Sequence, residues 1–390
     1  MPSPHVDAAG TPAAVHRAYR DLGVVGYILY GVGAASPFLR DALGLSDAQT
    51  GFHSSLVAIG LLTAGLIADR ADRRAGASRV HAAAALVGAG ATLLLAWAPA
   101  FAVTLLAALL IGLTAGLFLG HVNGLLGSDG GPEARVRLLR ANVFGIAGPF
   151  VVPIVIALGI AIGVGWQLVL VPSLVLLAMT FRDALRHGIP LASRAVGAAG
   201  RLPRPYWWSW LLVVTVVGVE FAIVFWAVTL VQRQTGATVA DATLVAALFY
   251  LGMLLGRLAL SFPALGERSP RLLVRGGLLL AIGGALLVWL APDARLSALA
   301  LLVAGLGVAG QYPLCAALAL ESGGGAPAAA ARLTLASGTA ILLSPLLLGA
   351  LADSVGVGVA WLMVPALAVA GLALTLVVGR PAPTRAAIAS

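Results

Sequence analysis

Long apolar runs recur along this sequence, and they constrain the fold more than any other feature. They extend from residue 20 to residue 379, with short polar breaks between them. Each run is about 20 residues long, which as a helix crosses a hydrocarbon core of about 30 Å. Of the 390 residues, 60% are hydrophobic and 10% charged, too few polar residues to cover the surface of a water-soluble protein. The sequence therefore predicts an all-α membrane protein.

We expect twelve transmembrane helices in two six-helix bundles. The predicted spans are residues 20–39, 51–69, 80–98, 101–124, 141–162, 166–181, 207–231, 243–262, 272–291, 297–319, 331–352 and 358–379. The longest break is basic, rich in Ala and Gly, and contains prolines, as is typical of a linker. The chain then divides into a tail (1–19), a first bundle (20–181), a linker (182–205), a second bundle (206–379) and a tail (380–390).

The arginines indicate how the chain is oriented. All 24 basic residues are arginine, and with the N-terminus inside, all except Arg40, Arg233 and Arg295 fall on the cytoplasmic side. We therefore expect a multi-pass protein of the bacterial inner membrane with both termini in the cytoplasm. The first residues show no cleaved signal peptide, so the first span should be retained. The net charge of +9 reflects this topology and an attraction to anionic lipids, and it requires no nucleic-acid partner. Nothing in the sequence argues against a monomer.

The stretch GLIADRADRR, residues 65–74, is unusually charged for this chain. Gly65 would let a neighbouring helix approach closely, and Asp69, on the same face, could accept hydrogen bonds from a helix N-terminus or pair with an arginine. Such contacts would form a gate on the cytoplasmic side. The alternative for Arg70, Arg73 and Arg74 is that they only anchor the topology.

Two echoes of this stretch occur elsewhere. Glu267, Arg268 and Arg271 repeat the acid, base, base spacing after the eighth span, which indicates that the halves are duplicated. Gly349 and Asp353 repeat the spacing of Gly65 and Asp69 at the opposite side of the membrane, as inverted repeats would.

Glu220 is the one carboxylate near the middle of a predicted span. A charge there costs about 2.5–3.5 kcal/mol on insertion scales, so it calls for a reason. Burial disfavours the ionised carboxylate, which suits a group that binds and releases protons near neutral pH. We predict that Glu220 carries the coupling proton or pairs with a cationic substrate. The alternative is a protonated side chain that only holds helices together.

The remaining polar and aromatic groups inside the spans are candidates for a substrate cavity, although helix packing would also explain each of them. These candidates are Tyr27, Tyr30, Trp226, Tyr250, Gln311 and Tyr312. Arg257 lies near an inner end, where it could reach the interface, and His121 is expected to be solvated at the end of its span. No nucleotide, metal or cofactor motif is present, so we expect no cofactor and no enzyme activity.

Two glycine patterns have structural interpretations. Gly112, Gly116, Gly120 and Gly124 form a stripe on one helix face, which favours close helix packing. Gly148 and Pro149 lie in the middle of the fifth span, where they predict a helix bend.

The charged stretch resembles the signature loop of the major facilitator superfamily, written GxLADRxGRR. Gly65, Asp69, Arg70, Arg73 and Arg74 match it, whereas Asp72 stands where the family has glycine. The resemblance implies two pseudo-symmetric bundles and transport by alternating access. It also implies that the first, fourth, seventh and tenth helices line the cavity, so that Tyr27, Tyr30, Glu220 and Gln311 converge.

We therefore predict a proton-coupled secondary active transporter that moves a small organic solute. The segment around Gly148 loosely resembles a motif of drug antiporters, which favours export. Residues 40–51 and 219–226 resemble the fucose-permease-like branch, which favours proton symport of a sugar or related solute. A third alternative is a transport-inactive scramblase or receptor with the same fold.

Overall fold

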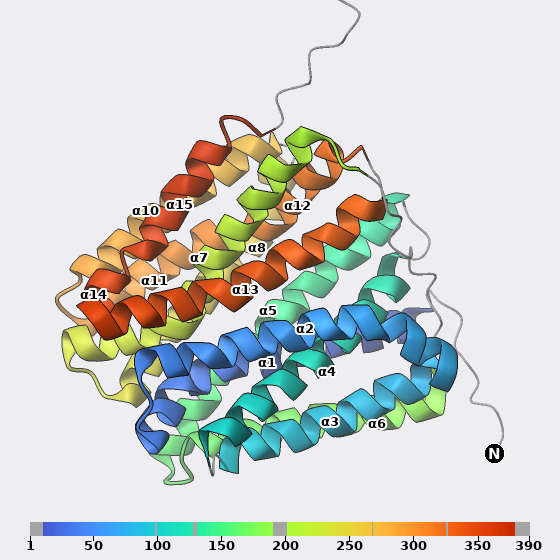
Figure 1. Cartoon of the computed structure of the whole chain (residues 1–390), viewed down its shortest axis with the longest axis horizontal. Coiled ribbons are helices and arrows are strands. Elements are labelled where there is room, and N and C mark those ends of the chain that lie inside the picture. Colours follow the sequence, from blue (N-terminus) through green and yellow to red (C-terminus); the bar gives the residue numbers. More distant parts are fainter. Residues whose placement is uncertain are drawn as a thin grey trace, which may run out of the picture.

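The computed structural model describes residues 11–97, 100–127, 131–189, 201–266, 268–324 and 327–378, and all regular elements in these ranges are helical (Figure 1). The first half contains α1 (Pro12–Leu43), α2 (Asp47–Ala75), α3 (Ala77–Trp97), α4 (Phe101–Gly127), α5 (Gly131–Ala161), the 3-10 helix η1 (Trp166–Val169) and α6 (Leu170–His187). The second half contains α7 (Arg204–Thr235), α8 (Val239–Leu260), α9 (Pro263–Gly266), α10 (Pro270–Leu290), α11 (Ala294–Val308), α12 (Gln311–Ser322), α13 (Pro327–Val355), α14 (Val357–Ala360) and α15 (Met363–Leu374).

Twelve helical segments are long and apolar enough to cross a membrane, so the predicted number of spans is confirmed. The first helix begins at Pro12, earlier than the predicted residue 20, because Thr11 caps it and Pro12 occupies its first position. The tenth span consists of α11 and α12, which meet at residues 309–310, and α14 and α15 together form the twelfth.

The C-terminal ends of the two central helices, α1 and α7, are built alike. Both α1 and α7 stop at a glycine in the left-handed conformation, Gly44 with φ 62° and Gly236 with φ 71°. After each glycine, a polar residue caps the next helix: Ser46 caps α2 and Thr238 caps α8. These turns return the chain into the membrane at equivalent places in both halves.

Helix contacts repeat between the halves, as a duplicated fold requires. In the first half, α1 packs on α5, α2 on α4, α3 on α4, and α3 on α6. In the second half, α7 packs on α13, α8 on α11, α10 on α11, and α10 on α15. The halves meet where α1, α2 and α5 face α7, α8 and α13, and Figure 1 shows α2 and α13 side by side.

The closest helix contacts are made by glycines in matching positions. A Cβ on Gly60 or Gly112 would lie 2.1 Å from a carbonyl oxygen across the α2–α4 contact. Gly252 and Gly305 make the corresponding approaches between α8 and α11, at 2.2 and 2.0 Å. Any side chain at these positions would push the helices apart. The packing role predicted for the glycine stripe is therefore confirmed at Gly112 and at Gly116, which would meet Ala64.

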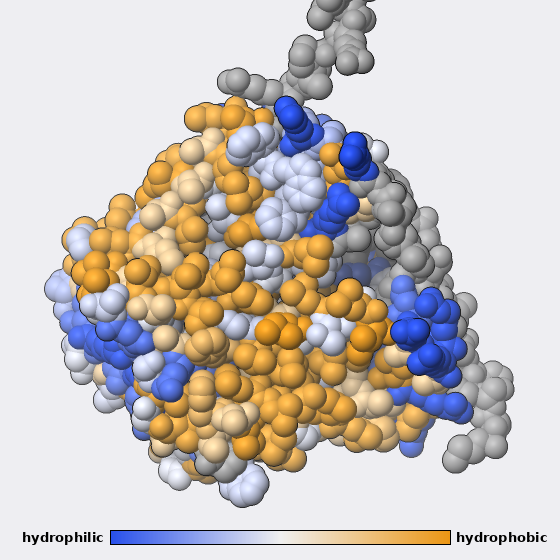
Figure 2. All heavy atoms as spheres, viewed as in Figure 1, coloured by the Kyte–Doolittle hydropathy of each residue, from blue (hydrophilic) through white to orange (hydrophobic). Residues whose placement is uncertain are grey.

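The outer surface of the protein is suited to lipid. Many large apolar side chains are exposed, among them Leu66, Leu290, Phe262 and Leu376. Figure 2 shows hydrophobic atoms over most of the visible face, with hydrophilic residues gathered towards two opposite edges. Because the bilayer core is apolar, these side chains require no further cover.

Candidate functional site

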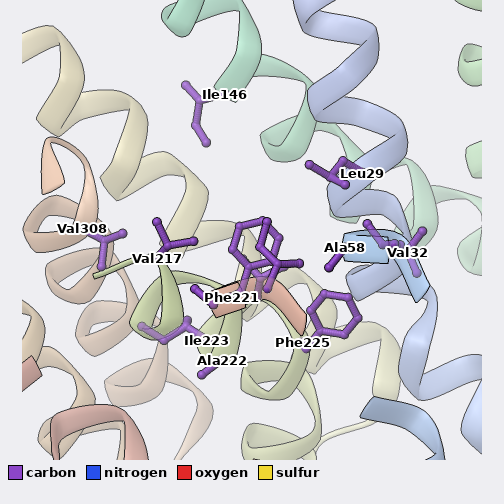
Figure 3. Packing of buried hydrophobic residues seen from close by; sticks show 14 of the residues in the cluster. Leu29, Val32, Ala58, Ile146, Val217, Phe221, Ala222, Ile223, Phe225 and Val308 are labelled. Atoms are coloured by element: carbon purple, nitrogen blue, oxygen red, sulfur yellow. The ribbon is translucent and has the colours of Figure 1, made fainter. Parts of the chain in front are cut away.

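The centre of the protein is formed by α1 and α7, which are buried more completely than the other spans. The apolar window of α7 is 89% buried and that of α1 is 78% buried, because other helices surround both. Figure 3 shows Phe221 and Phe225 of α7 near Leu29 and Val32 of α1. A polar side chain on the facing sides of these helices therefore lies at the seam between the halves, away from lipid.

Glu220 occupies such a position. Its side chain is only 6% exposed, and it accepts a hydrogen bond from the hydroxyl of Tyr30 on α1. This bond links the two halves at mid-membrane. Because the acceptor is a carboxyl group, gain or loss of a proton at Glu220 changes the strength of this link directly. The sequence predicted both residues for the site, and the structure brings them together.

Three further groups surround this pair. The ring of Tyr250 on α8 stands edge-on to that of Tyr30, with centroids 5.9 Å apart. Arg257, two turns beyond Tyr250 on the same face of α8, lies near enough for its charge to act on both Glu220 and Tyr30. Tyr312 on α12 is also within electrostatic range of Glu220, and Tyr312 is 40% exposed. A carboxyl, three hydroxyls and a cation therefore gather at the seam.

The sequence position of Arg257 suggested that its side chain could extend to the membrane interface, but in the structure it turns towards the other half. It donates to the carbonyl oxygens of Asn142 on α5, at 2.8 Å, and of Ala309, at 3.2 Å. The second carbonyl is free because α11 ends there and α12 has not begun. Arg257 is thus a second link between the halves, and the break in the tenth span supplies part of it.

A small cavity lies beside Tyr250 and crosses the seam. Its walls come from α1, α5, α7 and α8, and they include Ala34, Pro153, Val224 and Thr243. Most of this lining is apolar, with the hydroxyls of Thr243 and Tyr250 as the polar groups. The volume of the cavity is about 10 Å³, room for a single water molecule, so this state of the protein is closed to a solute at that point.

Three residues predicted for the cavity donate hydrogen bonds within a single half. Tyr27 donates to the carbonyl of Val169 at 3.0 Å, inside the first half. Trp226 is fully buried and donates to the carbonyl of Pro345 at 2.9 Å. Gln311 donates to the carbonyls of Val274 and Gly307. These contacts fit the packing alternative, while the assignment of the three residues to the cavity stays a prediction.

The halves are fastened together at the end of the protein where α1 and α7 stop. Asp353, at the end of α13, accepts hydrogen bonds from the backbone N–H groups of Asp47 and Ala48, at 2.8 and 2.9 Å, and from the Ser46 hydroxyl, at 2.9 Å. These groups form the N-terminus of α2, where backbone donors and the helix dipole favour an anion. Gly349 permits the approach, since a Cβ there would lie 2.5 Å from the carbonyl oxygen of Asp47.

An ion-pair network adjoins this cap. Arg233 of α7 binds both oxygens of the buried Asp47, at 2.7 and 2.8 Å. Arg40 of α1 donates to Thr229 and Gln232 of α7, at 3.2 and 3.3 Å. Arg40 and Arg233 are two of the three arginines that departed from the cytoplasmic pattern. That departure was the sequence signal for the network, although no role was predicted for these two arginines.

The predicted cytoplasmic gate is organised differently from the expectation. Gly65 is exposed with no atom within 4 Å of a built Cβ, so the close approach expected there is absent. Arg70, Arg73 and Arg74 are exposed and Asp69 is partly buried. The buried carboxylate of the stretch is Asp72, which contacts His121 at 3.0 Å. His121 is therefore not solvated, in contrast to the prediction, because it lies between helices rather than at their surface.

Gly148 and Pro149 lie within a continuous α5, at its contact with α1. A Cβ on Gly148 would lie 2.6 Å from the carbonyl oxygen of Gly23. Close packing therefore accounts for the glycine, and the predicted bend stays a prediction. Among the described residues, no group of three or more His, Cys, Asp or Glu side chains is placed to hold a metal ion.

Comparison with known proteins identifies the fold. The model of the Major Facilitator Superfamily matches residues 22–323. A bacterial homologue of the human lysosomal transporter Spinster, inward-facing and occupied, is 15% identical with a TM-score of 0.67, covering 93% of this chain and 95% of that one. A variant of the nucleoside transporter NupG is 16% identical with a TM-score of 0.73, covering 93% and 99%. A variant of the Escherichia coli fucose:proton symporter FucP is 15% identical with a TM-score of 0.64, covering 94% and 98%. No curated protein sequence matches.

Proposed function

The chain belongs to the Major Facilitator Superfamily, and from this we propose that it is a secondary active transporter in which Glu220 carries the coupling proton. The observation that carries the proposal is the hydrogen bond between Tyr30 and Glu220 across the seam. An ionised Glu220 accepts strongly from Tyr30, whereas a protonated one accepts weakly, so proton binding and the separation of the halves are coupled.

The surroundings of Glu220 suit a small organic solute. The hydroxyls of Tyr30, Tyr250 and Tyr312 and the guanidinium of Arg257 can make hydrogen bonds, and the aromatic rings offer faces for stacking. The small adjoining cavity is walled by both halves, so their separation would enlarge it and give a solute access to these groups. This arrangement supports alternating access, with the protein acting alone in the membrane as a monomer.

The arginine distribution supports a bacterial inner-membrane location with both termini in the cytoplasm. On this orientation, the closed end carrying Asp353 and Arg233 faces outward. The charged stretch with Arg70, Arg73 and Arg74 faces the cytoplasm and anchors the topology there.

The direction of transport has two candidates. Export by exchange for a proton is the reaction we propose first, since a cationic solute and a proton would compete for the single carboxylate Glu220. Import by proton symport is the second, and the likeness of the fold to a fucose:proton symporter favours it. A scramblase or receptor would have no use for a titratable group at mid-membrane.

The test is Glu220→Gln in proteoliposomes, with Glu321→Gln as the control because Glu321 is an exposed glutamate on α12. We expect the Glu220 variant to lose solute movement driven by a pH gradient while keeping exchange of labelled for unlabelled solute. The control should keep both. Gradient-driven transport at the wild-type rate in Glu220→Gln would refute the role. The sign of the gradient that drives uptake into vesicles of known orientation distinguishes export from import.

A further inference from the structure

A second group of titratable side chains lies in the first half, away from Glu220. Asp21 of α1, His81 of α3, His121 of α4 and Asp72 of α2 form a row, here called the histidine chain. All four are buried, with exposed fractions between 1% and 7%. Each helix of the first four contributes one member, at the end of the protein that carries most arginines.

The contacts in the row are continuous. Nε2 of His81 lies 3.3 Å from Asp21, Nδ1 of His81 lies 3.0 Å from Nδ1 of His121, and Nε2 of His121 lies 3.0 Å from Asp72. The ring of Phe118 stacks on His81, with centroids 4.2 Å apart, and fixes its plane. Both nitrogens of both rings are therefore engaged.

Counting protons shows what this geometry needs. Three contacts in a row need three protons, whichever atoms carry them, because each hydrogen bond contains one. Two ionised aspartates and two neutral histidines supply only two protons. One contact would then hold no proton, so that two ring nitrogens, or a ring nitrogen and a carboxylate, would face each other with lone pairs only. A buried contact of that kind is unfavourable. The third proton removes it.

We propose that the histidine chain is a binding site for one proton, distinct from Glu220. The proton is shared along the row, and binding forms the third hydrogen bond without breaking any other bond. Because the members lie on four helices, the bound proton ties α1, α2, α3 and α4 together. The inference does not depend on the transport proposal, since it follows from the contacts of the row alone.

The charges around the row are compatible with a positive charge. Asp21 also accepts from Arg20 at 2.8 Å and from Thr180 at 2.8 Å, and Arg20 in turn pairs with Asp183 of α6. Arg17 of α1 lines a small cavity beside His81 and His121. Three guanidinium groups near the row, those of Arg17, Arg20 and Arg182, stand against the carboxylates of Asp21, Asp72 and Asp183, and Arg182 pairs with Asp183 at 3.3 Å. The carboxylates at the two ends of the row stabilise the added charge by accepting hydrogen bonds from the rings.

The cavity provides a route for the proton. It is bounded by Asp21, His81 and His121 on one side and by Gly188 and Ile189, which follow α6, on the other. This is the side that the arginines predict to be cytoplasmic. The site would therefore exchange protons with the cytoplasm. Because Asp72 belongs to the charged stretch at the end of α2, a proton bound to the histidine chain would hold that end of α2 in place.

The first test counts protons on ring nitrogens of the full chain, labelled with ¹⁵N-histidine, by NMR in detergent at about pH 8, above the ordinary titration of imidazole. We expect two histidines to hold three protons between them. His53 is the internal reference, because it is buried but bonded only to Thr50 and Thr104, and it should hold one. A spectrum in which every histidine holds one proton would overturn the proposal. This test uses the wild-type protein and requires no variant.

The second test uses Asp72→Asn. The amide can donate to Nε2 of His121, so the row keeps three hydrogen bonds while the two histidines hold only two protons. We expect the NMR signature to disappear in this variant and to persist in His53→Gln. The wild-type folded state binds a proton that unfolded histidines release at this pH, so its melting temperature should fall as pH rises past neutrality. Asp72→Asn should show a shallower fall, and equal slopes in the two proteins would count against the site.

Discussion

Asp353→Ala tests whether the outer cap holds the two halves closed. The substitution removes the acceptor for two N–H groups of α2 and for the Ser46 hydroxyl. Loss of a capping side chain costs about 1 kcal/mol, and the helix dipole adds a few tenths. Since Asp353 is exposed, water replaces part of the contact, so we take about 1 kcal/mol in total. If the cap exists only in the closed state, the ratio of closed to open outer ends falls by a factor of about five.

The populations can be measured by double electron–electron resonance with spin labels on cysteines at Trp97 and Leu290, which end α3 and α10 and are exposed. Cys315→Ala provides the background, as Cys315 is the one native cysteine. The control is Ser354→Ala, next to Asp353, because Ser354 is exposed and its hydroxyl bonds the carbonyl of Leu351 in the same helix. We expect the long-distance population to grow in the Asp353 variant and not in the control. An unchanged distribution in Asp353→Ala would refute the reasoning, whatever its effect on transport.

Other predictions follow from the packing and the outer network. Gly349→Val should open the outer end as well, since a Cβ there would meet Asp47 and Trp226. Gly358→Ala should not, because no atom lies within 4 Å of a Cβ at that position, and the same resonance experiment compares the two variants. Gly112→Ala should lower the free energy of unfolding by about 1–3 kcal/mol through overpacking against α2, measured by denaturant unfolding, while Gly90→Ala on α3 should be neutral or stabilising. Cys315, which is fully buried, should react with a maleimide only after unfolding, as mass spectrometry of the folded and unfolded protein would show.

The sequence was sufficient for the fold because the bilayer imposes a simple rule. A span needs about 20 apolar residues and satisfies its backbone internally, so hydropathy alone located all twelve spans. Helix ends were less predictable, since they depend on local caps such as Thr11 and on polar first turns that extend beyond the hydrocarbon. The break between α11 and α12 has a sequence signal that was overlooked, because Pro313 has no N–H to bond the carbonyl of Ala309 four residues earlier.

The site was predicted in part, and the difference follows from what a sequence records. Glu220 stood out because a carboxylate in hydrocarbon is costly, and Tyr30 was found with it. The partners of Tyr27 and Trp226 could not be predicted, since a helix position gives depth in the membrane but not which neighbour the side chain faces. His81 was overlooked and His121 misjudged, because a histidine near a helix end looks solvated until its partners on other helices are known.

The glycine and aspartate spacing carries a physical meaning that does not depend on which side of the membrane it occupies. Four residues bring both onto one face of a helix, where the glycine admits a neighbouring helix and the aspartate accepts from its N-terminus. The sequence predicted this arrangement for Gly65 and Asp69, yet the structure shows it for Gly349 and Asp353. Inverted repeats explain why one spacing occurs at both ends. With the halves joined at the outer end, the outer copy is engaged while Gly65 stands free of neighbours, as expected if closing one end separates the other. An outward-open state should therefore reverse the two, with Gly65 packed and Gly349 exposed.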